Sequence, residues 1–444
     1  MLAGLRTPPG AADMVDRIWP LLEAMYPICR SITGNGVRRT FDLLQDVAPL
    51  QRHEVPTGTV AYDWEVPNEW NIRDAYVADQ SGRRVIDFRA HSLHVVNYST
   101  PVRTRLSLDA LQPRLHSRPD QPDWIPYRTT YYKQDWGFCL RHRDRERLAP
   151  GTYEVVIDSE LAPGHLTYAE CVIQGRSDEQ GIVYTHSCHP SLANDNLTGL
   201  AASALLAQAL RAEKPRLTWR FVFGPGTIGS LVWLSRNEAL LPRLRTGLVI
   251  GLLGDPGLLT YKRSRRGDTG TDRAAEHVLR AEAGARTEDF EPYGYDERQF
   301  CSPGFDLPVG RVTRSANGRY PEYHTSADDL SLIRRDRLAD SLRALAELIC
   351  VLDENRYVHN LSPKGEPRLG KRGLYGSVGG LTPGTFEQAA LWVLSMSDGS
   401  HDLVEIAARS RIPWAAVLEA ASRLEGTGLT RTIGLEEQRQ RRGW

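Results

Sequence analysis

The feature that most constrains the fold is a polar loop between an apolar strand and an apolar helix. The loop occupies residues 185–199 and contains His186, His189 and Asp195. The apolar run directly before it is typical of a buried strand, and residues 200–210 after it have helical spacing and composition. Strand, loop and helix in this order predict an open α/β sheet, in which sites lie at the carboxyl ends of the strands. Two imidazoles and a carboxylate in such a loop predict a metal site.

A second segment supplies a third histidine. His324 follows Tyr323, and a helix-start signal comes after it at Ser326 and Asp328. Zinc favours imidazole nitrogen and carboxylate oxygen, and a catalytic zinc keeps its fourth position for water or substrate. A lone histidine before a proline is most often only a loop residue. The prediction of a zinc site therefore depends on the grouping of these side chains around an Asn-Asp-Asn turn.

Length and charge exclude several classes of protein. The 444 residues are enough for two or three domains with ample core. The 55 basic and 55 acidic residues cancel, so no global field favours nucleic acid or a membrane surface. No apolar stretch approaches the roughly 18 residues that span a bilayer, and the N-terminus lacks the apolar core of a signal peptide. We therefore expect a cytoplasmic protein that binds neither nucleic acid nor membrane.

The six cysteines are scattered without paired spacing, which predicts reduced thiols. Cys188 and Cys301 lie in the two loops that hold most of the candidate site residues, and they could be soft metal ligands or nucleophiles. An enzyme with a Cys/His nucleophile therefore stays open as a second interpretation.

The character of the sequence changes along the chain. Residues 14–47 indicate two helices, and from about residue 53 to about residue 160 alternating β-type runs and turn signals indicate an antiparallel insertion. Strands and helices then alternate over residues 169–349, as a sheet with crossover helices requires. Aromatic residues of the insertion are most simply sheet core. Its stretch 126–133 is nevertheless rich enough in side-chain donors to form a wall of a substrate site.

The C-terminal part of the sequence predicts a winged helix. After a glycine-rich link at residues 371–380, helix-like runs cover residues 385–396, 401–410 and 413–425, and residues 426–433 form a wing. The recognition helix of this pattern carries one arginine and two glutamates, whereas phosphate binding needs clustered Lys and Arg. We therefore expect this domain to contact protein, as a partner-binding or dimerisation module, rather than DNA.

Five short phrases are spread over nearly the whole chain, at residues 26–34, 188–191, 225–230, 261–264 and 296–299. Together with the Asn-Asp-Asn-x-x-Gly and Tyr-His-Thr-x-x-Asp patterns, they resemble a bacterial aminopeptidase-like family of the clan MH zinc exopeptidases. The resemblance implies an α/β class fold with three parts: a zinc-exopeptidase-like α/β/α sheet over residues 1–52 and 161–365, an inserted small antiparallel β domain over residues 53–160, and a C-terminal winged-helix domain over residues 380–444.

The resemblance also implies roles for the candidate ligands. Asp195 matches the carboxylate that bridges two zinc ions in the aminopeptidases. His189 or His186 matches the histidine of one metal, and His324 matches that of the other. Asp255 follows a strand-like run and matches an acidic ligand, although Asp-Pro-Gly is also a plain turn sequence. The implied cofactor is one or two zinc ions.

The sequence departs from the clan at one important place. In typical members a Glu-Glu pair follows the next strand, where this chain has residues 224–227, Gly-Pro-Gly-Thr. Peptide hydrolysis normally needs a base and an acid in addition to the metal. Glu297, in a loop that matches a pocket-lining loop of the clan, is the substitute that we expect to act on water or to bind a substrate amine.

Other charged residues near Glu297 are candidates for contact with the substrate. We expect Asp296, Arg298 and Tyr323 to take part in substrate binding, although adjacent charges usually form a solvated loop with a local ion pair. Five basic residues could add positive charge for a substrate carboxylate or could form an exposed basic strand: Lys262, Arg263, Arg265, Arg266 and Arg314.

Three functions remain open at this point. The first is a zinc-dependent aminopeptidase-like hydrolase that cleaves an N-terminal aminoacyl bond with zinc-activated water. The second is a hydrolase or transferase of the same fold that acts on a non-peptide amide in polysaccharide or natural-product biosynthesis. The third is a catalytically inactive protein that binds partners. In each case we expect a homo-oligomer that assembles through the C-terminal domain or the β insertion.

Overall fold

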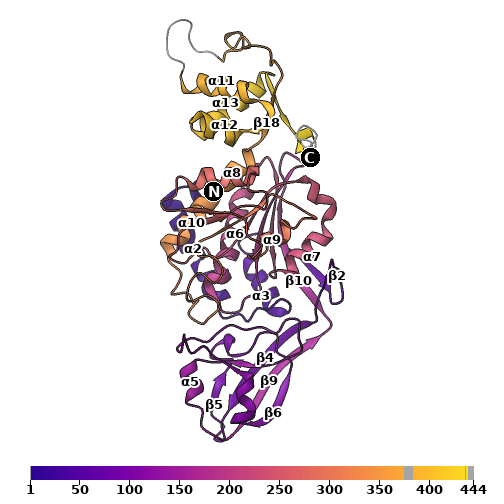
Figure 1. Ribbon diagram of the computed structural model, residues 1–444, viewed down its shortest axis with the longest axis vertical. Coiled ribbons are helices and arrows are strands. Elements are labelled where there is room, and N and C mark those ends of the chain that lie inside the picture. The colour runs from indigo at the N-terminus through magenta and orange to yellow at the C-terminus, as the bar shows by residue number, and fades with distance from the viewer. Residues whose placement is uncertain (1, 375–383, 436, 439–444) are drawn as a thin grey trace.

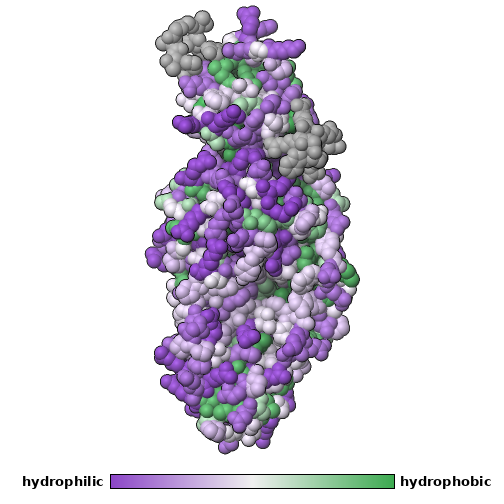
Figure 2. Space-filling model, in the orientation of Figure 1, coloured by the Kyte–Doolittle hydropathy of each residue, from purple (hydrophilic) through white to green (hydrophobic). Residues whose placement is uncertain are grey.

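In the computed structural model, three parts follow one another along the long axis of the molecule (Figure 1). The structure describes residues 2–374, 384–435 and 437–438, so the predicted link at 371–380 and the end of the predicted winged helix lie partly outside it. Hydrophilic and apolar residues are mixed over the face shown in Figure 2. No helix within the described ranges is both long enough and apolar enough to cross a membrane.

The central domain is built on an eight-stranded sheet with the order β1-β10-β12-β11-β13-β16-β14-β15. Strand β11 pairs in parallel with β12 and with β13, and β13 pairs in parallel with β16, whereas β1, β10 and β14 join by antiparallel pairing. Strand β11 is buried along its whole length, as expected for a strand covered on both faces. The bounds are β1 Gln51–Pro56, β10 His165–Ile173, β11 Gln180–His186, β12 Thr218–Gly224, β13 Leu244–Ile250, β14 Thr260–Lys262, β15 Arg286–Glu288 and β16 Val309–Thr313.

Helices cover both faces of this sheet. Successive side chains of β11 point to opposite faces, so Val183 enters one core cluster while Ile182 and Tyr184 enter the other. Five helices supply most of the helical residues of the first cluster, and one helix supplies most of those of the second, which also contains much of the β insertion. These helices are α2 Pro8–Met25, α3 Asn35–Leu44, α6 Thr198–Arg211, α8 Gly270–Leu279 and α10 Arg335–Glu354 in the first cluster, and α7 Ile228–Arg236 in the second.

The inserted domain is a four-stranded antiparallel sheet with the order β5-β4-β9-β6. Its bounds are β4 Glu69–Ala78, β5 Arg84–Asp87, β6 Val102–Ser107 and β9 Thr152–Ala162, and two small ribbons accompany it, β2 Val60–Ala61 with β3 Trp64–Glu65 and β7 Leu115–His116 with β8 Phe138–Cys139. Its core is continuous with the second core cluster of the central domain. The insertion also returns to the central domain at Pro126, which forms a β-bridge with Thr325.

The C-terminal domain has a three-stranded sheet with the order β18-β17-β19 and a core cluster of its own. Its elements are β17 Tyr357–Asn360, α11 Thr385–Met396, β18 Asp398–Asp402, α12 Leu403–Ser410, α13 Trp414–Gly426 and β19 Thr430–Ile433. Strand β17 lies before the glycine-rich link, so the sheet of this domain begins earlier than residue 380. The short strand is separated from its partners in the sequence, and this is why the local pattern does not reveal it.

Candidate metal centre

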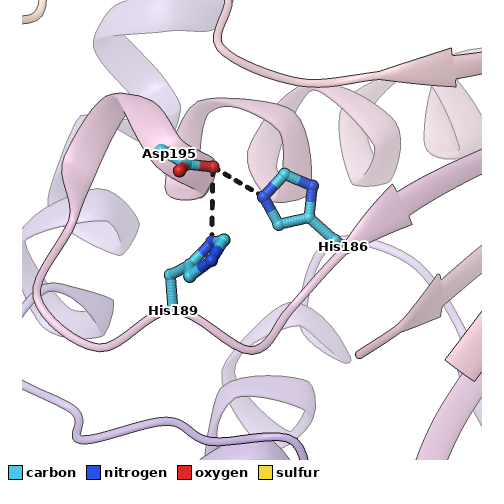
Figure 3. A group of neighbouring side chains, drawn as sticks. All are labelled: His186, His189 and Asp195. Atoms are coloured by element: carbon cyan, nitrogen blue, oxygen red, sulfur yellow. Dashed lines mark hydrogen bonds and ion pairs between the residues drawn. The ribbon is translucent and has the colours of Figure 1, made fainter. Parts of the chain in front are cut away.

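Three histidines and one aspartate meet at the carboxyl end of β11, and Figure 3 shows three of them. His186 ends β11, His189 lies in the following loop, and Asp195 lies in the helical turn Ala193–Leu197 that leads into α6. His186 Nε2 lies 2.6 Å and His189 Nδ1 3.3 Å from Asp195 Oδ1. His324 Nε2 lies 3.1 Å from Asp195 Oδ2. The structure thus brings together four of the five predicted metal ligands.

Three donor atoms of this cluster are buried and have no hydrogen-bond partner: His189 Nδ1, Asp195 Oδ2 and His324 Nε2. Unpartnered buried polar atoms are costly, so such a group in one place needs an explanation. A cation would satisfy all three. The donor atoms of His186, His189 and Asp195 all lie within 4.8 Å of one another, and His324 Nε2 lies 3.1 Å from Asp195 Oδ2. Imidazole nitrogen and carboxylate oxygen are ligands that zinc prefers. The donor set therefore fits zinc.

Burial and mutual contact set the protonation states of the cluster. Burial pushes the pKa of Asp195 upward, but His186, His189 and His324 outweigh this and hold that pKa well below its usual value. Burial lowers the pKa of His189 and of His324, in spite of the adjacent carboxylate. At neutral pH the cluster therefore presents an ionised Asp195 and neutral imidazoles at His189 and His324, which are the forms that bind a metal.

A second carboxylate, Asp328, holds the turn that carries Asp195. It accepts hydrogen bonds from the backbone N–H groups of Asn194 at 2.6 Å and Asp195 at 3.1 Å, and from the hydroxyl of Tyr320 at 3.2 Å. Burial and the charge of Asp195 raise the pKa of Asp328 well above its usual value. Partners of this kind fix the orientation of metal ligands. The sequence showed Asp328 only as a helix-start signal and as the last residue of the Tyr-His-Thr-x-x-Asp pattern.

Aromatic rings enclose the cluster. The ring centroid of Tyr295 lies 4.1 Å from that of His186, and Tyr127 of the inserted domain lies 5.3 Å from His189 and 5.0 Å from His324. Tyr323 stacks on His324 with the centroids 3.9 Å apart. The predicted substrate residue Tyr323 thus lies at the cluster, and the stretch 126–133 reaches it through Tyr127. Tyr295 could not be recognised as a site residue from the sequence, because nothing local distinguishes it from a core aromatic residue.

Tyr295 also fills the space after β12, where the clan has its Glu-Glu pair. A Cβ atom on Gly226 would collide with the hydroxyl and ring of Tyr295. Cys188 lies beside them, with its Sγ atom 3.7 Å from that hydroxyl and 3.3 Å from the Gly226 nitrogen. Burial raises the pKa of Cys188 to about 12 and that of Cys301 to about 11. Both are therefore thiols at neutral pH, and the interpretation as a cysteine-nucleophile enzyme has no support.

Asp255 lies outside the cluster. Its carboxylate accepts hydrogen bonds from Ser315 Oγ at 2.5 Å, from the Gly257 N–H at 2.8 Å and from Asn194 Nδ2 at 3.0 Å. These bonds join three loops. They agree with the interpretation of Asp-Pro-Gly as a plain turn sequence. The position directly after β13 is Gly251, where a Cβ atom would lie 2.6 Å from Asn196 Oδ1. The contacts of Asp255 therefore do not place it as a ligand of a second metal.

Glu297 does not offer the free carboxylate that the sequence analysis expected. Its side chain is 0 % exposed, and its Oε1 atom lies 3.0 Å from Lys262 Nζ and 3.5 Å from Arg311 Nη1. Its Oε2 atom accepts a hydrogen bond from the backbone N–H of Tyr295 at 3.1 Å. These are the surroundings of a buried ion pair that positions Tyr295. The sequence could not show this, because the two cations come from β14 and β16.

Asp296 and Arg298 have buried atoms without partners. Asp296 Oδ1 accepts hydrogen bonds from the Thr227 N–H at 2.8 Å and from Ser230 Oγ at 2.7 Å, at the start of α7. Its Oδ2 atom and Arg298 Nε are buried and unpartnered. Burial raises the pKa of Asp296 to about 7. No described hydrogen bond joins Asp296 or Arg298 to the histidines, so their predicted contact with substrate stays a prediction.

The five basic residues that the sequence offered for a substrate carboxylate have partners. Arg314 donates to the backbone carbonyls of Leu253 and Gly257. Lys262 pairs with Glu297, as described above. Arg263 pairs with Glu276 and Asp289, and both Arg265 and Arg266 pair with Asp306.

The sheet order, the flanking helices and the cluster at the end of β11 define an α/β fold of the zinc-aminopeptidase type. BSAP, a zinc aminopeptidase from Bacillus subtilis, superposes with a TM-score of 0.57 at 12% identity, over 77% of this chain and 94% of that chain. At this identity the likeness concerns the fold alone. It confirms the fold class that the sequence predicted.

The chain belongs to the family described as a domain of unknown function (DUF4910), which it matches over residues 19–355. Residues 356–432 match a winged helix-turn-helix family, which confirms the C-terminal module. A Clostridium acetobutylicum protein, provisionally named a polysaccharide biosynthesis protein with an aminopeptidase-like domain, is 47% identical over 419 residues, 94% of this chain and 96% of that protein. A crystal structure from the same organism, provisionally described as a peptidase, superposes with a TM-score of 0.86 at 45% identity over 96% of this chain and 98% of that chain.

Proposed function

We propose that the protein is a zinc-dependent hydrolase that cleaves an amide bond, in the manner of an aminopeptidase. The observation that supports this proposal is the convergence of three buried, unpartnered donor atoms from His189, Asp195 and His324. These residues would hold the metal. When bound, zinc would polarise the scissile carbonyl and lower the pKa of a water molecule.

In this proposal the site holds one ion. Asp255 is occupied by Ser315, Gly257 and Asn194. The positions that could carry further ligands hold no carboxylate, because Pro225 and Gly226 follow β12 and Gly251 follows β13. His186 donates to Asp195 Oδ1 at hydrogen-bond distance, 2.6 Å, and would orient the carboxylate toward the metal. Carboxylate–imidazole contacts of this kind orient ligands and tune a metal site.

The surrounding residues would enclose the substrate. Tyr127 and Tyr323 contact the rings of the metal ligands from different domains, so they would exclude water from the reacting amide. Glu297 is held by Lys262 and Arg311 and would position Tyr295 rather than accept a proton.

Metal analysis of the full chain tests the proposal. Protein purified without chelator should contain about one zinc per chain, and Asp195→Asn or His324→Ala should lower this occupancy while leaving the chain folded. His165→Ala, which removes an exposed histidine on β10, is the matched control and should keep the wild-type zinc content. Wild-type zinc in both Asp195→Asn and His324→Ala would remove the central claim.

The name of the Clostridium relative favours a second candidate, in which the amide belongs to a polysaccharide precursor rather than a peptide. A panel of aminoacyl amides, acylated amino acids and N-acetylated sugars separates the two candidates. Turnover should appear in one of these groups only and should disappear in His324→Ala. A protein that binds zinc but turns over no member of the panel would instead support the inactive, partner-binding alternative.

A further inference from the structure

A polar cavity of about 390 Å³ lies where β14 and β16 meet the segment 288–294. Its wall includes Lys262, Gly294, Arg311, Asn317 and Arg319, and we call it the Arg311 pocket. Cavities of roughly 300–1,000 Å³ are typical of small-molecule sites. The size of the cavity is therefore suited to one end of a small substrate.

A short chain of contacts joins the Arg311 pocket to the metal centre. Arg311 Nη1 donates to Asn317 Oδ1 at 3.2 Å, and Asn317 Nδ2 donates to the hydroxyl of Tyr323 at 3.4 Å. Tyr323 in turn stacks on His324. A molecule that occupies the pocket therefore lies beside the residues that flank the proposed zinc site.

The wall of the pocket carries more buried positive than negative charge. Lys262 and Arg311 are 4% and 7% exposed, and they share one carboxylate, that of the fully buried Glu297. Of the acidic residues that line the pocket, Glu288 pairs with Arg319, Asp289 pairs with Arg263, and Glu291 is exposed. Buried charges are costly unless they are paired. A bound anion would balance the surplus cation.

Of the two buried cations, Arg311 is the one that keeps hydrogen-bond donors without partners. The ammonium group of Lys262 already donates to the carbonyls of Glu291 and Tyr293, at 2.6 Å and 2.7 Å, and to Glu297. Within the described part of the chain, Arg311 makes hydrogen bonds through its Nη1 atom only. Its Nε atom is buried without a partner, and its Nη2 atom makes no hydrogen bond to a described residue. Nε and Nη2 form the edge of a guanidinium that binds a carboxylate through two parallel hydrogen bonds.

We propose that the Arg311 pocket binds a carboxylate of the substrate, so that the amide cleaved at the metal centre belongs to an acidic molecule. This inference rests on the proposed function, because it assigns the pocket to the substrate of that site. It names the chemical class of the substrate: an amide with a free carboxylate on the side that lies toward Tyr323. An acidic peptide and an amidated sugar acid share this chemistry.

Direct binding to the full chain tests the proposal without requiring turnover. The probes are N-acetylglutamate and its neutral counterpart N-acetylglutaminamide, titrated by calorimetry into zinc-loaded and zinc-free protein. The acid should bind and the neutral amide should not. Arg311→Lys keeps the charge beside Glu297 but loses the two-donor edge, so it should weaken binding of the acid by about ten- to a hundredfold. Arg286→Lys makes the same change at an exposed arginine of β15 that does not line the pocket, so it is the matched control and should bind like wild type.

Further probes separate the two sources of the carboxylate. Tighter binding of acidic dipeptides than of glucuronate assigns the pocket to peptides, and the reverse order assigns it to sugar acids. Equal binding of the acid and the neutral amide, tighter binding of inorganic phosphate than of any carboxylate, or undiminished binding in Arg311→Lys would overturn the proposal. If the protein binds no zinc but still binds the acid through Arg311, the proposed hydrolase fails and the carboxylate site stands. If it binds zinc but not the acid, the pocket assignment fails alone.

Discussion

Asp195 must stay ionised in a place that water does not reach. Burial alone raises the pKa of a carboxylate, and it does so at Asp296 and Asp328, which are equally buried. The difference at Asp195 is the set of three imidazoles around its two oxygens, which reverses the direction of the shift. The pKa of a buried acid is therefore decided by its contacts, and the pKa values of aspartates in neighbouring loops shift in opposite directions.

Asp296 should make the stability of the protein depend on pH. Its folded-state pKa of about 7 lies above the ordinary value of 3.8, so between these pH values the folded chain binds a proton that the unfolded chain does not. Stability is therefore lost as the pH rises through this window. Asp296→Asn removes this titrating group. The free energy of unfolding of the variant should therefore exceed that of wild type by on the order of 4 kcal/mol above pH 7, and by little below about pH 4. Urea unfolding at several pH values measures the difference.

The control for this experiment is Asp178→Asn, which alters an exposed carboxylate. Its difference from wild type should stay small across the same pH range. If Asp296→Asn also shows no pH-dependent difference, the carboxyl group is not held protonated in the folded state.

Glu297→Gln should act on stability. It leaves Lys262 and Arg311 buried without their shared anion, and removing one partner of a buried ion pair costs about 3–5 kcal/mol. Zinc content should be unchanged, because no imidazole contacts Glu297 in the described structure and a glutamine oxygen can still accept the hydrogen bond from the Tyr295 N–H that positions Tyr295. Glu288→Gln, which removes a partly exposed partner of Arg319, should cost less than about 1 kcal/mol. Unchanged stability with turnover reduced by about 10²–10⁴ would instead identify Glu297 as the general base.

At the scale of helices and strands, the sequence predicted the elements well where the hydrophobic period and the residue propensities agree. The expected strand and helix around the polar loop match β11 and α6 closely, and the three C-terminal helices lie within a few residues of their predicted ranges. His186, His189 and Asp195 meet for the same reason, since the loop after β11 leaves the sheet at its carboxyl end, whereas His324 joins them from a distant segment after β16. Contacts between distant strands were not predictable. The partners of Glu297 come from β14 and β16, and no local pattern places those strands beside its loop.

Gly226→Ala should disturb the loop between β12 and α7. The added Cβ atom would overlap the hydroxyl and ring of Tyr295, which is packed between this loop and His186. Overpacking of this kind costs about 1–3 kcal/mol. Because Tyr295 supports a metal ligand, zinc affinity should also fall, by about tenfold or more. Competition with a chromophoric chelator measures the affinity, and urea unfolding measures the stability.

Gly304→Ala is the matched control, because a Cβ atom there meets no atom within 4 Å. It should leave both quantities near wild type. Wild-type zinc affinity in Gly226→Ala would show that Tyr295 has no part in supporting the site.

At the scale of the whole molecule, both appended domains are tied to the central one by buried contacts. The insertion shares the second core cluster and contributes Tyr127 to the metal centre. The winged helix is attached through Arg273 of α8, which pairs with Asp402 and donates to the hydroxyl of Tyr357 at 2.8 Å. The sequence revealed the winged helix but not this attachment, since its two charged residues lie in different domains.

Arg273→Ala should weaken the attachment. Asp402 is 0% exposed, so losing its cation leaves a buried charge with fewer partners, at a cost of about 3–5 kcal/mol. Limited proteolysis should then release the winged helix faster than in wild type, and the thermal transition should broaden or split. Arg280→Ala, which removes an exposed arginine at the end of the same helix, should change neither. An unchanged proteolysis rate in Arg273→Ala would mean that the apolar contacts alone hold the domains together.

The winged helix should not bind duplex DNA. Helix α13, which takes the place of a recognition helix, carries Glu419, Arg423 and Glu425, and Glu425 lies 3.6 Å from the buried Arg356. Affinity for phosphates comes from clustered cations that release counterions, so a DNA-binding domain loses about 10³–10⁵ in affinity between about 50 and 200 mM salt. Fluorescence anisotropy of a labelled duplex with the full chain should show no binding at either salt concentration. Binding that weakens steeply with salt, and that Arg423→Ala reduces, would show that the domain binds DNA in spite of the few cations on α13.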